Sequence, residues 1–418
     1  MPNRTQLNTV SYRKDSYIVA QGRNTAECFF IVMQGHVRIS RRVDIAGIAD
    51  EVLAPGDFFG VISTMSSQKH IEDAFALTDV TLIAVSLDQY VTLIRNNTPV
   101  AIKILTQLSG QLRLLDGALA SITAKQDVND NTIEGTSRLF NAAEYYLQQK
   151  RYEHAFYAYN KYIKYGPEGE DRTVAGYRLE KISMEAKGLK LREFPKGETN
   201  RSYQKGEALF IEGQPGRELY VIQNGSIEVS KIEGDKEVLL GTLRAGDILG
   251  EMALLENKAR TASAIVTEDC NVMIIKKNNF EILIKEQPEL VAKITTLLAN
   301  RVWFIFKQLE NSLMINPIGR IYGALFVQLE KAHLSPEATH AHFFAITWND
   351  LVNMLGLGEK EGYVLMGSVL RDQNIQIKKD SSIHIGSIRD LALRAESYRK
   401  MDGIEKSAKS GNHHIKRD

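Results

Sequence analysis

Two short segments, near residues 250 and 260, carry side chains suited to binding a phosphate-type anion. Arg260 offers a planar fork of N–H donors that can form charge-assisted hydrogen bonds to an oxyanion. Gly250 precedes a predicted short helix, where free backbone N–H groups and the helix dipole attract an anion. Glu251 can only accept hydrogen bonds, and Thr261 and Ser263 add hydroxyl groups beside the arginine. This pattern predicts a binding site for a phosphate ester that also carries hydroxyl groups.

The two segments form a recognisable motif. Residues 246–255 read Gly-Asp-Ile-Leu-Gly-Glu-Met-Ala-Leu-Leu, and residues 260–264 read Arg-Thr-Ala-Ser-Ala. Together they resemble the phosphate-binding cassette of cyclic-nucleotide-binding domains, and the resemblance extends over residues 203–310. It implies a cyclic AMP or cyclic GMP ligand, with Glu251 accepting from the ribose 2′-hydroxyl and Arg260 binding the exocyclic phosphate oxygens. The residues that it implicates are Gly250, Glu251, Met252, Ala253, Arg260, Thr261 and Ser263. A plainer alternative is an ion pair between Glu251 and Arg260 that braces an empty β-roll.

The framework around this motif occurs twice in the chain. From Phe30 and Tyr220 onward, two segments keep a constant offset through an apolar run, a glycine and a Gly-Asp turn. Residues 37–40 and 227–230 alternate apolar and polar side chains, as half-buried strands do. Glycines separate these short segments at regular intervals, which favours a compact antiparallel roll similar to a jelly roll. The sequence therefore predicts two β-rolls of the same fold.

The first copy lacks the chemistry of the second. At the shared offset, Val61 stands in place of Glu251 and His70 in place of Arg260. Two further carboxylates, Glu72 and Asp73, lie close by in the sequence and would repel a phosphate. We therefore expect a degenerate roll with a structural or dimerising role. The alternatives are a different ligand that uses His70 as a partial anion contact, or a haem-sensing role for that histidine.

A long helix is predicted after each roll. In the first copy, leucines at steps of three and four over residues 105–122 form a coiled-coil seam. A similar but broader apolar stripe covers residues 291–309. Such stripes indicate a homodimer seam, a pairing of the two helices within one chain, or packing of each helix on its own roll. By resemblance, Ile305 and Phe306 lie where the second helix would cover the nucleotide base.

Between the rolls, aromatic and small residues recur at the spacings of a tetratricopeptide repeat. This pattern places small residues where two antiparallel helices cross and aromatic residues where they interlock. Residues 172–189 add a third, capping helix. A single repeat cannot bury its apolar face alone, so we predict an all-α hairpin spacer, with a partner-binding surface as the alternative. The residues that carry the pattern are Phe140, which replaces the usual Trp, Ala143, Tyr146, Ala155, Tyr159, Tyr162 and Pro167.

The region after the second long helix is similar to the winged helix-turn-helix of Crp/Fnr transcription regulators. The similarity rests on residues 316–325 and 346–356, in which Thr347 would cap the first helix and a glycine would occupy the tight turn. Residues 370–375 resemble the end of a recognition helix, and residues 377–385 resemble the wing. The resemblance implies a transcription regulator that binds DNA.

The predicted recognition helix departs from that pattern. It lacks the arginines that read guanine edges, and Glu359 and Glu361 would meet DNA phosphates with like charge. The residues predict weak or lost DNA binding, made mainly through phosphates. The only cations near it are Lys360, Arg371, Lys378 and Lys379.

Composition excludes several other classes of protein. The net charge of +1 gives no overall attraction to nucleic acid or to an anionic membrane. Two cysteines, Cys28 and Cys270, cannot form a disulfide framework or a four-cysteine metal site. No signal peptide or membrane-spanning run is predicted, so we expect a cytoplasmic protein that uses no metal. The polar tail, including His413 and His414, is expected to be disordered and to bind no metal.

These observations predict an α+β multidomain protein that is not an enzyme. We expect a degenerate roll at 1–125, the spacer at 136–190, a competent roll at 191–313, a winged helix-turn-helix at 314–398 and a disordered tail at 399–418. The predicted function is transcription regulation, with a cyclic nucleotide in the second roll relayed through the long helix. The alternative is a signalling or scaffold protein that has lost DNA binding and acts on a protein partner, for instance at the spacer.

Overall fold

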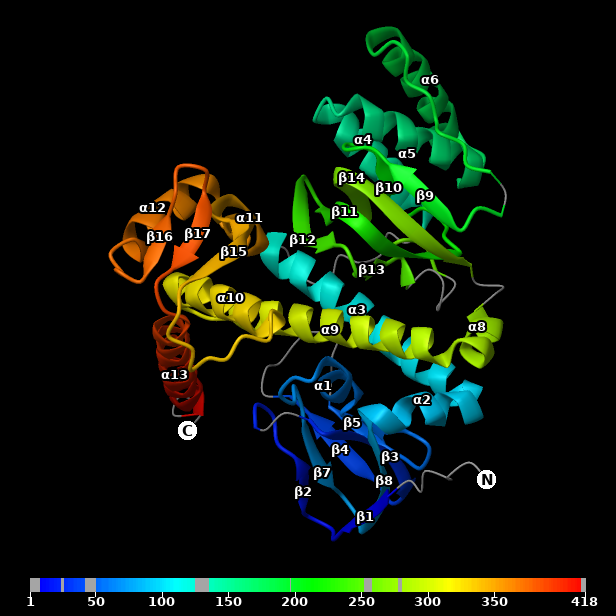
Figure 1. The fold of residues 1–418 in the computed structure, drawn as a ribbon. Helices are drawn as coiled ribbons and strands as arrows, with labels where there is room; N and C mark the ends of the chain where they lie inside the picture. The colour runs from blue at the N-terminus through cyan, green and yellow to red at the C-terminus, as the bar shows by residue number, and fades with distance from the viewer. Residues whose placement is uncertain are drawn as a thin grey trace. The chain divides into compact units, whose positions relative to one another are not determined.

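The computed structural model describes residues 8–23, 26–41, 50–124, 135–195, 197–251, 258–276 and 280–414 (Figure 1). The chain divides into two compact units, one made of Met1–Ala120 with Asp127–Trp303 and the other of Ser121–Gln126 with Phe304–Asp418. Within the described ranges, no helix is both long enough and apolar enough to span a bilayer.

The first roll consists of two four-stranded antiparallel sheets, ordered β1-β8-β3-β6 and β2-β7-β4-β5. Alternation explains the burial: in Val37–Ser40 the two apolar side chains are buried and Arg38 is exposed. Phe30, Val32 and Leu82 contribute to the core between the sheets. The strands are β1 (Asn8–Tyr12), β2 (Tyr17–Val19), β3 (Cys28–Gln34), β4 (Val37–Ser40), β5 (Glu51–Leu53), β6 (Phe58–Phe59), β7 (Asp73–Ala76) and β8 (Val80–Ser86). A short helix, α1 (Val61–Ser66), follows β6.

The second roll repeats this arrangement with longer strands. Phe30 pairs with Ala84 in the first roll, and Tyr220 pairs with Ile274 at the same offset in the second. Gly35 and Gly225 both have positive φ, and a Cβ on either would lie 2.3 Å from a backbone oxygen of the neighbouring segment. The strands are β9 (Asn200–Tyr203), β10 (Ala208–Phe210), β11 (Glu218–Glu233), β12 (Lys236–Arg244), β13 (Ile248–Leu249) and β14 (Ser263–Lys276).

Each roll continues into helices, as predicted. The first leads into α2 (Leu87–Asn96) and α3 (Thr98–Ala124), and the second into α8 (Phe280–Glu286) and α9 (Pro288–Ser312). The seam leucines Leu105, Leu108, Leu112 and Leu115 are at most 2% exposed in the single chain. The Tyr90 hydroxyl from α2 also lies 3.0 Å from the Thr295 hydroxyl of α9. The seam is therefore buried within one chain, and the predicted homodimer draws no support from it.

Three helices lie between the rolls: α4 (Thr136–Gln148), α5 (Tyr152–Tyr165) and α6 (Glu170–Glu185). This helical spacer shares one apolar core with Ile211 and Ile265 of the second roll. Gly213 marks the point of closest approach, because a Cβ there would lie 2.5 Å from the Leu139 backbone nitrogen. In Figure 1 the spacer lies over β10 and β14. Its apolar face, which the sequence offered as a partner surface, is thus covered by the chain itself; the tetratricopeptide assignment stays a prediction.

A buried carboxylate at this junction makes stability depend on pH. Burial raises the pKa of Glu212 to about 7 from an ordinary value of 4.5, although Arg138, 3.6 Å away, opposes the shift. A raised folded-state pKa gives stability that is present below pH 4.5 and lost as the pH rises through 7. Between these values the unfolding free energy should fall by on the order of 3 kcal/mol more in the natural protein than in Glu212→Gln. Denaturant unfolding at several pH values checks this; parallel curves for the two proteins would contradict it.

The segment expected to form a winged helix-turn-helix lies in the second unit. Its elements are α10 (Pro317–Lys331), β15 (His342–Thr347), α11 (Trp348–Met354), α12 (Glu359–Val369), β16 (Ile375–Ile377) and β17 (Ser382–Ile385). Thr347 caps α11 as predicted, with its hydroxyl accepting from the Asp350 N–H. Gly356 takes a φ of 63° in the turn. Gly362 allows α12 to approach α11, since a Cβ would lie 2.9 Å from the Val352 side chain.

The expected disorder from residue 399 onward is wrong for the described part of the tail. Helix α13 runs through Ile388–His414. Leu391 and Ala395 are buried in the core of this unit, and the Asp402 carboxylate accepts from the Ile315 N–H at 2.7 Å. The segment is polar but rich in residues of high helix propensity and free of proline, so an anchored first half can extend into a helix. Residues 415–418 lie outside the described ranges.

Candidate functional site

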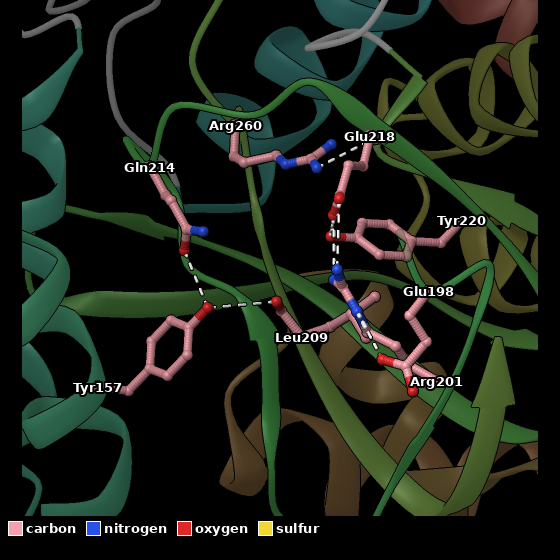
Figure 2. A network of polar contacts seen from close by, with 8 residues as sticks. All are labelled: Tyr157, Glu198, Arg201, Leu209, Gln214, Glu218, Tyr220 and Arg260. Atoms are coloured by element: carbon pink, nitrogen blue, oxygen red, sulfur yellow. Dashed lines mark hydrogen bonds and ion pairs between the residues drawn. The ribbon is translucent and has the colours of Figure 1, made fainter. Parts of the chain in front are cut away.

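Arg260 lies buried in the second roll, with only 4% of its surface exposed. Its backbone is fixed by two hydrogen bonds to the loop before β11: its N–H donates to the Gln214 carbonyl and its carbonyl accepts from the Gly213 N–H. The guanidinium lies over the Phe210 ring, 4.3 Å from its centre. It donates to the carbonyl oxygen of Gly250 at 2.6 Å. It also donates to the carbonyl oxygen of Glu218 at 2.8 Å (Figure 2).

This guanidinium has unused capacity for an anion. Its Nε atom is buried without a hydrogen-bond partner, and no carboxylate pairs with it among the residues that the structure describes. A buried cation without a counter-charge is costly. Gly250 is needed beside it, because a Cβ would lie 2.2 Å from the arginine's Nη1 atom. An oxyanion at this position would supply the missing charge.

Glu251 has a different partner from the one that the plainer alternative assigned. It pairs with Arg301 of α9, whose Nη1 lies 3.3 Å from a carboxylate oxygen. Arg301 also contacts Asp116 of α3 at 3.4 Å. The Glu251–Arg260 ion pair of the plainer alternative is thus absent from the described contacts, because Arg260 donates to backbone carbonyls.

The Glu251–Arg301–Asp116 cluster is almost fully buried. Burial by itself would lower the pKa of Arg301, but Glu251 and Asp116 outweigh it and raise that pKa. Burial raises the pKa of Asp116 to about 6, with Arg301 acting in the opposite direction. Neither Arg301 nor Asp116 was predicted from the sequence. The available signal was a charged residue on each of two otherwise apolar helix stripes.

The cavity at these residues measures about 20 Å³, the scale of one water molecule. Thr261 lines it, whereas the Ser263 hydroxyl accepts from the Glu212 N–H toward the spacer. A cavity of this size holds no nucleotide unless its lining rearranges. Met252 and Ala253 lie outside the described residues. Ile305 and Phe306 on α9 are buried, at 3% and 1% exposure; their base-covering role stays a prediction.

The first roll supplies its own anion at the equivalent position. His70 matches Arg260, since its carbonyl accepts from the Gly22 N–H as that of Arg260 does from Gly213. Glu72 accepts from the Gly60 N–H at 3.1 Å and from Arg41 at 3.1 Å. In the second roll Ala262 stands in place of this glutamate. The Glu72 carboxylate thus already accepts the Gly60 N–H hydrogen bond that a phosphate would need.

Burial lowers the pKa of His70, more than nearby Glu72 raises it. The neutral imidazole therefore predominates near pH 7 and adds little attraction for a phosphate. Val61 is buried at 4% exposure and offers no acceptor for a ribose hydroxyl. No group of His, Cys, Asp and Glu in the described ranges could hold a metal ion. These contacts favour the degenerate interpretation of the first roll.

We predict that the full chain binds one cyclic nucleotide, because Glu72 competes for the Gly60 amide in the first roll. Isothermal titration calorimetry with cyclic AMP should give a stoichiometry of about one per chain. The substitution Glu72→Gln should leave that number unchanged, since Val61 and His70 still supply no ribose or phosphate contact. A stoichiometry of two in the natural protein would show that the first roll is a working site.

The predicted DNA-contacting cations lie on the surface of the second unit. Lys360 on α12, Arg371 after it, and Lys378 and Lys379 in the wing are at least partly exposed. Helix α12 also exposes two large apolar side chains, with Tyr363 77% and Val364 69% exposed. Helix α12 carries no arginine, and the DNA contacts of these cations stay a prediction.

Comparison with known proteins matches the two rolls to one family. The cyclic nucleotide-binding domain family matches residues 9–97 and again residues 200–287. These matches confirm the two predicted domains of this type. They also confirm that the chain repeats itself, since each match covers one β-roll.

The curated relatives include transcription regulators. The chain is 31% identical over 103 residues to the cyclic AMP receptor protein of Thermus thermophilus, covering 24% of this chain and 48% of that protein. It is 32% identical over 129 residues to the anaerobic regulatory protein of Bacillus subtilis, covering 30% and 54% respectively. The chain thus spans about half the length of these two relatives.

A longer match is to the cAMP-activated global transcriptional regulator CRP of Salmonella typhimurium, 29% identical over 178 residues and covering 41% of this chain and 82% of that protein. Among solved structures, a CRP/FNR-family transcriptional regulator from Thermus thermophilus matches with a TM-score of 0.37 at 19% identity, covering 47% of this chain and 98% of that one. The chain therefore contains two cyclic nucleotide-binding domains and is related to CRP-type transcription regulators.

Proposed function

We propose that this protein is a cyclic-nucleotide-responsive transcription regulator of the Crp/Fnr type, with its ligand site in the second roll. The observation that carries the proposal is the buried Arg260 guanidinium beside Gly250. The Nε atom of Arg260 has no hydrogen-bond partner, and no described carboxylate neutralises the guanidinium. A cyclic phosphodiester keeps one negative charge at all pH values near neutrality and would neutralise this arginine. Glu251 would then accept from the ribose hydroxyl in place of Arg301.

Titration calorimetry on the full chain tests the ligand. We expect saturable binding of cyclic AMP or cyclic GMP, and much weaker binding of 5′-AMP, whose phosphate carries a second charge and is not tethered to the ribose 3′-oxygen. Equal binding of the cyclic and linear nucleotides would contradict the proposal. The apolar side chains Ile305 and Phe306 offer no hydrogen-bond readout of a base, so only modest discrimination between the two cyclic nucleotides is expected.

The relay would begin at Arg301. Its helix, α9, runs without interruption from Pro288 through Ser312, so displacement of Arg301 from Glu251 acts on an element that continues into the second unit. A ligand can shift such an equilibrium only through its different affinities for the two states. Hydrogen exchange over residues 316–386 should change when the cyclic nucleotide is added. An unchanged pattern there would argue against the relay.

DNA binding through the second unit would use the exposed cations of α12 and the wing. Selection of genomic fragments, with and without the cyclic nucleotide, at several potassium chloride concentrations tests this. We expect steeply salt-dependent binding that Lys378→Ala with Lys379→Ala weakens at every sequence, because phosphate contacts carry no sequence information. Tight binding that is insensitive to salt would contradict it.

A second candidate is a signalling protein that acts on a protein partner. The observation that favours it is the exposure of Tyr363 and Val364 on α12 and of Leu370 just after it, in place of base-reading arginines. Such a face suits a protein surface better than a charged duplex. Under this alternative we expect no DNA binding, and substitution of Val364 by Asp should weaken binding of the protein partner.

A further inference from the structure

A second, much larger cavity lies between the spacer and the second roll. It measures about 1070 Å³ and is bounded by α5, by residues 188–194 and by the outer strands of the roll. The cavity at Glu251 measures only about 20 Å³ and has a different lining, except that Arg260 contributes to both. The larger cavity belongs to a single compact unit of the chain. The two cavities meet at Arg260 and differ in the rest of their linings.

Its charge is strongly positive. Eight of the lining side chains are Lys or Arg, and three are Glu. Two of these glutamates are already used, Glu207 by Arg192 at 3.1 Å and Glu218 by Arg201 at 3.1 Å. Even if Glu153 is counted in full, the cations exceed the carboxylates. A concave, partly enclosed surface of one sign concentrates ligands of the opposite sign.

Lys161 is the most informative of these cations. It is partly buried on α5, with its Nζ 4.8 Å from the centre of the Tyr157 ring. Burial lowers the pKa of Lys161, and the like charges of Lys164 and Arg201 lower it further. No carboxylate pairs with this lysine in the part of the chain that the structure describes. A lysine held among like charges would be stabilised by a bound anion.

Two walls of the cavity are linked through polar contacts. The Tyr157 hydroxyl of the spacer donates to the Leu209 carbonyl at 3.3 Å and to the Gln214 side chain at 3.2 Å (Figure 2). The Gln214 carbonyl accepts from the Arg260 N–H. The Nε of Arg260, which has no partner, lies against Gly216, where a Cβ would be 2.5 Å away. Both Gly216 and Arg260 line the cavity.

We propose that this cavity binds an organic polyphosphate, with Lys161 from the spacer and Arg217 and Arg260 from the roll as the principal contacts. Charge-assisted N–H bonds to phosphate oxygens are strong, and Arg in particular matches their geometry. The volume is at the upper end of small-molecule sites, which is more than one phosphate group would fill. Several separated cations match several phosphoryl groups on one molecule, and the spacer would then close one side of the site.

The test is a titration of the full chain with inorganic tripolyphosphate and with ATP, both without magnesium, followed by calorimetry. We expect saturable binding of both, weakened roughly tenfold by Lys161→Ala through loss of one charge-assisted bond. Lys181→Ala is the matched control, since Lys181 is an exposed lysine on α6 of the same spacer and does not line the cavity. It should leave binding unchanged.

Cyclic AMP binding provides a readout that separates this proposal from the proposed function. Lys161 does not line the 20 Å³ cavity, so Lys161→Ala should leave the affinity for cyclic AMP unchanged. Tripolyphosphate binding in a chain that binds no cyclic nucleotide would remove the proposed function and support this site. Absence of saturable polyphosphate binding would overturn the polyphosphate site. So would an equal loss of polyphosphate affinity in Lys161→Ala and Lys181→Ala, or Lys161-dependent binding of an acidic peptide but not of tripolyphosphate.

Discussion

Replacing Arg260 by alanine should weaken cyclic nucleotide binding by more than roughly tenfold, because each charge-assisted hydrogen bond that is lost contributes about 1.5–3 kcal/mol. Arg260 and Arg301 are the two described cations that line the cavity at Glu251. Arg301 is already held by two carboxylates, whereas Arg260 donates to the Gly250 carbonyl. Calorimetry with cyclic AMP on the full chain measures the effect. Arg260→Lys should recover only part of the affinity, since an ammonium cannot bind a phosphate through two parallel N–H groups.

Two controls make this prediction specific. Arg244→Ala removes an exposed arginine at the end of β12 in the same roll, outside the cavity lining, and should leave the affinity unchanged. Arg260 donates to two carbonyl oxygens, which lose this partner in Arg260→Ala. Circular dichroism therefore serves as the second control and should show that the variant keeps its fold. Equal affinity in the folded Arg260→Ala protein would remove the assignment of the site.

Replacing Gly213 by alanine should separate the spacer from the second roll. A Cβ at this position would lie 2.5 Å from the Leu139 nitrogen and 2.6 Å from the Gly135 carbonyl oxygen. Both are backbone atoms at the start of α4, so no side-chain rotation relieves the overlap. We expect the unfolding free energy to fall by roughly 3 kcal/mol more than backbone strain alone would cost when alanine replaces a positive-φ glycine. Hydrogen exchange in α4 and α5 should also become faster.

Gly246→Ala isolates the contribution of backbone strain. Gly246 has a φ of 94°, comparable to the 80° of Gly213, but a Cβ there would have no neighbour within 4 Å. Gly246→Ala should therefore lower the unfolding free energy only by the conformational penalty of about 1–2 kcal/mol for an alanine in the left-handed region. Similar unfolding free energies for the two variants, measured in urea, would show that the spacer does not dock at Gly213.

The sequence by itself determined the repeated rolls and named the residues of the proposed nucleotide site. Strand alternation, positive-φ glycines and helix caps depend on neighbouring residues, so they can be read from a local pattern. Gly35 and Gly225 mark the same close approach in both copies, and Thr347 caps α11 through a residue three positions along. Arg260 and Glu251 were found in the same way, because the cassette is nearly continuous in the chain.

Only the tertiary structure decided what these residues contact. Arg301 comes from a helix fifty residues beyond Glu251, and Asp116 comes from the helix of the other roll, so no local pattern joins them. Glu72 can fill the first site only because the strand pairing brings it to the Gly60 N–H. The docking of the spacer at Gly213 and the cationic cavity beneath Lys161 likewise arise where separate segments meet. Long-range packing, which periodicity does not encode, therefore set the partners, the burial and the pKa values at both sites.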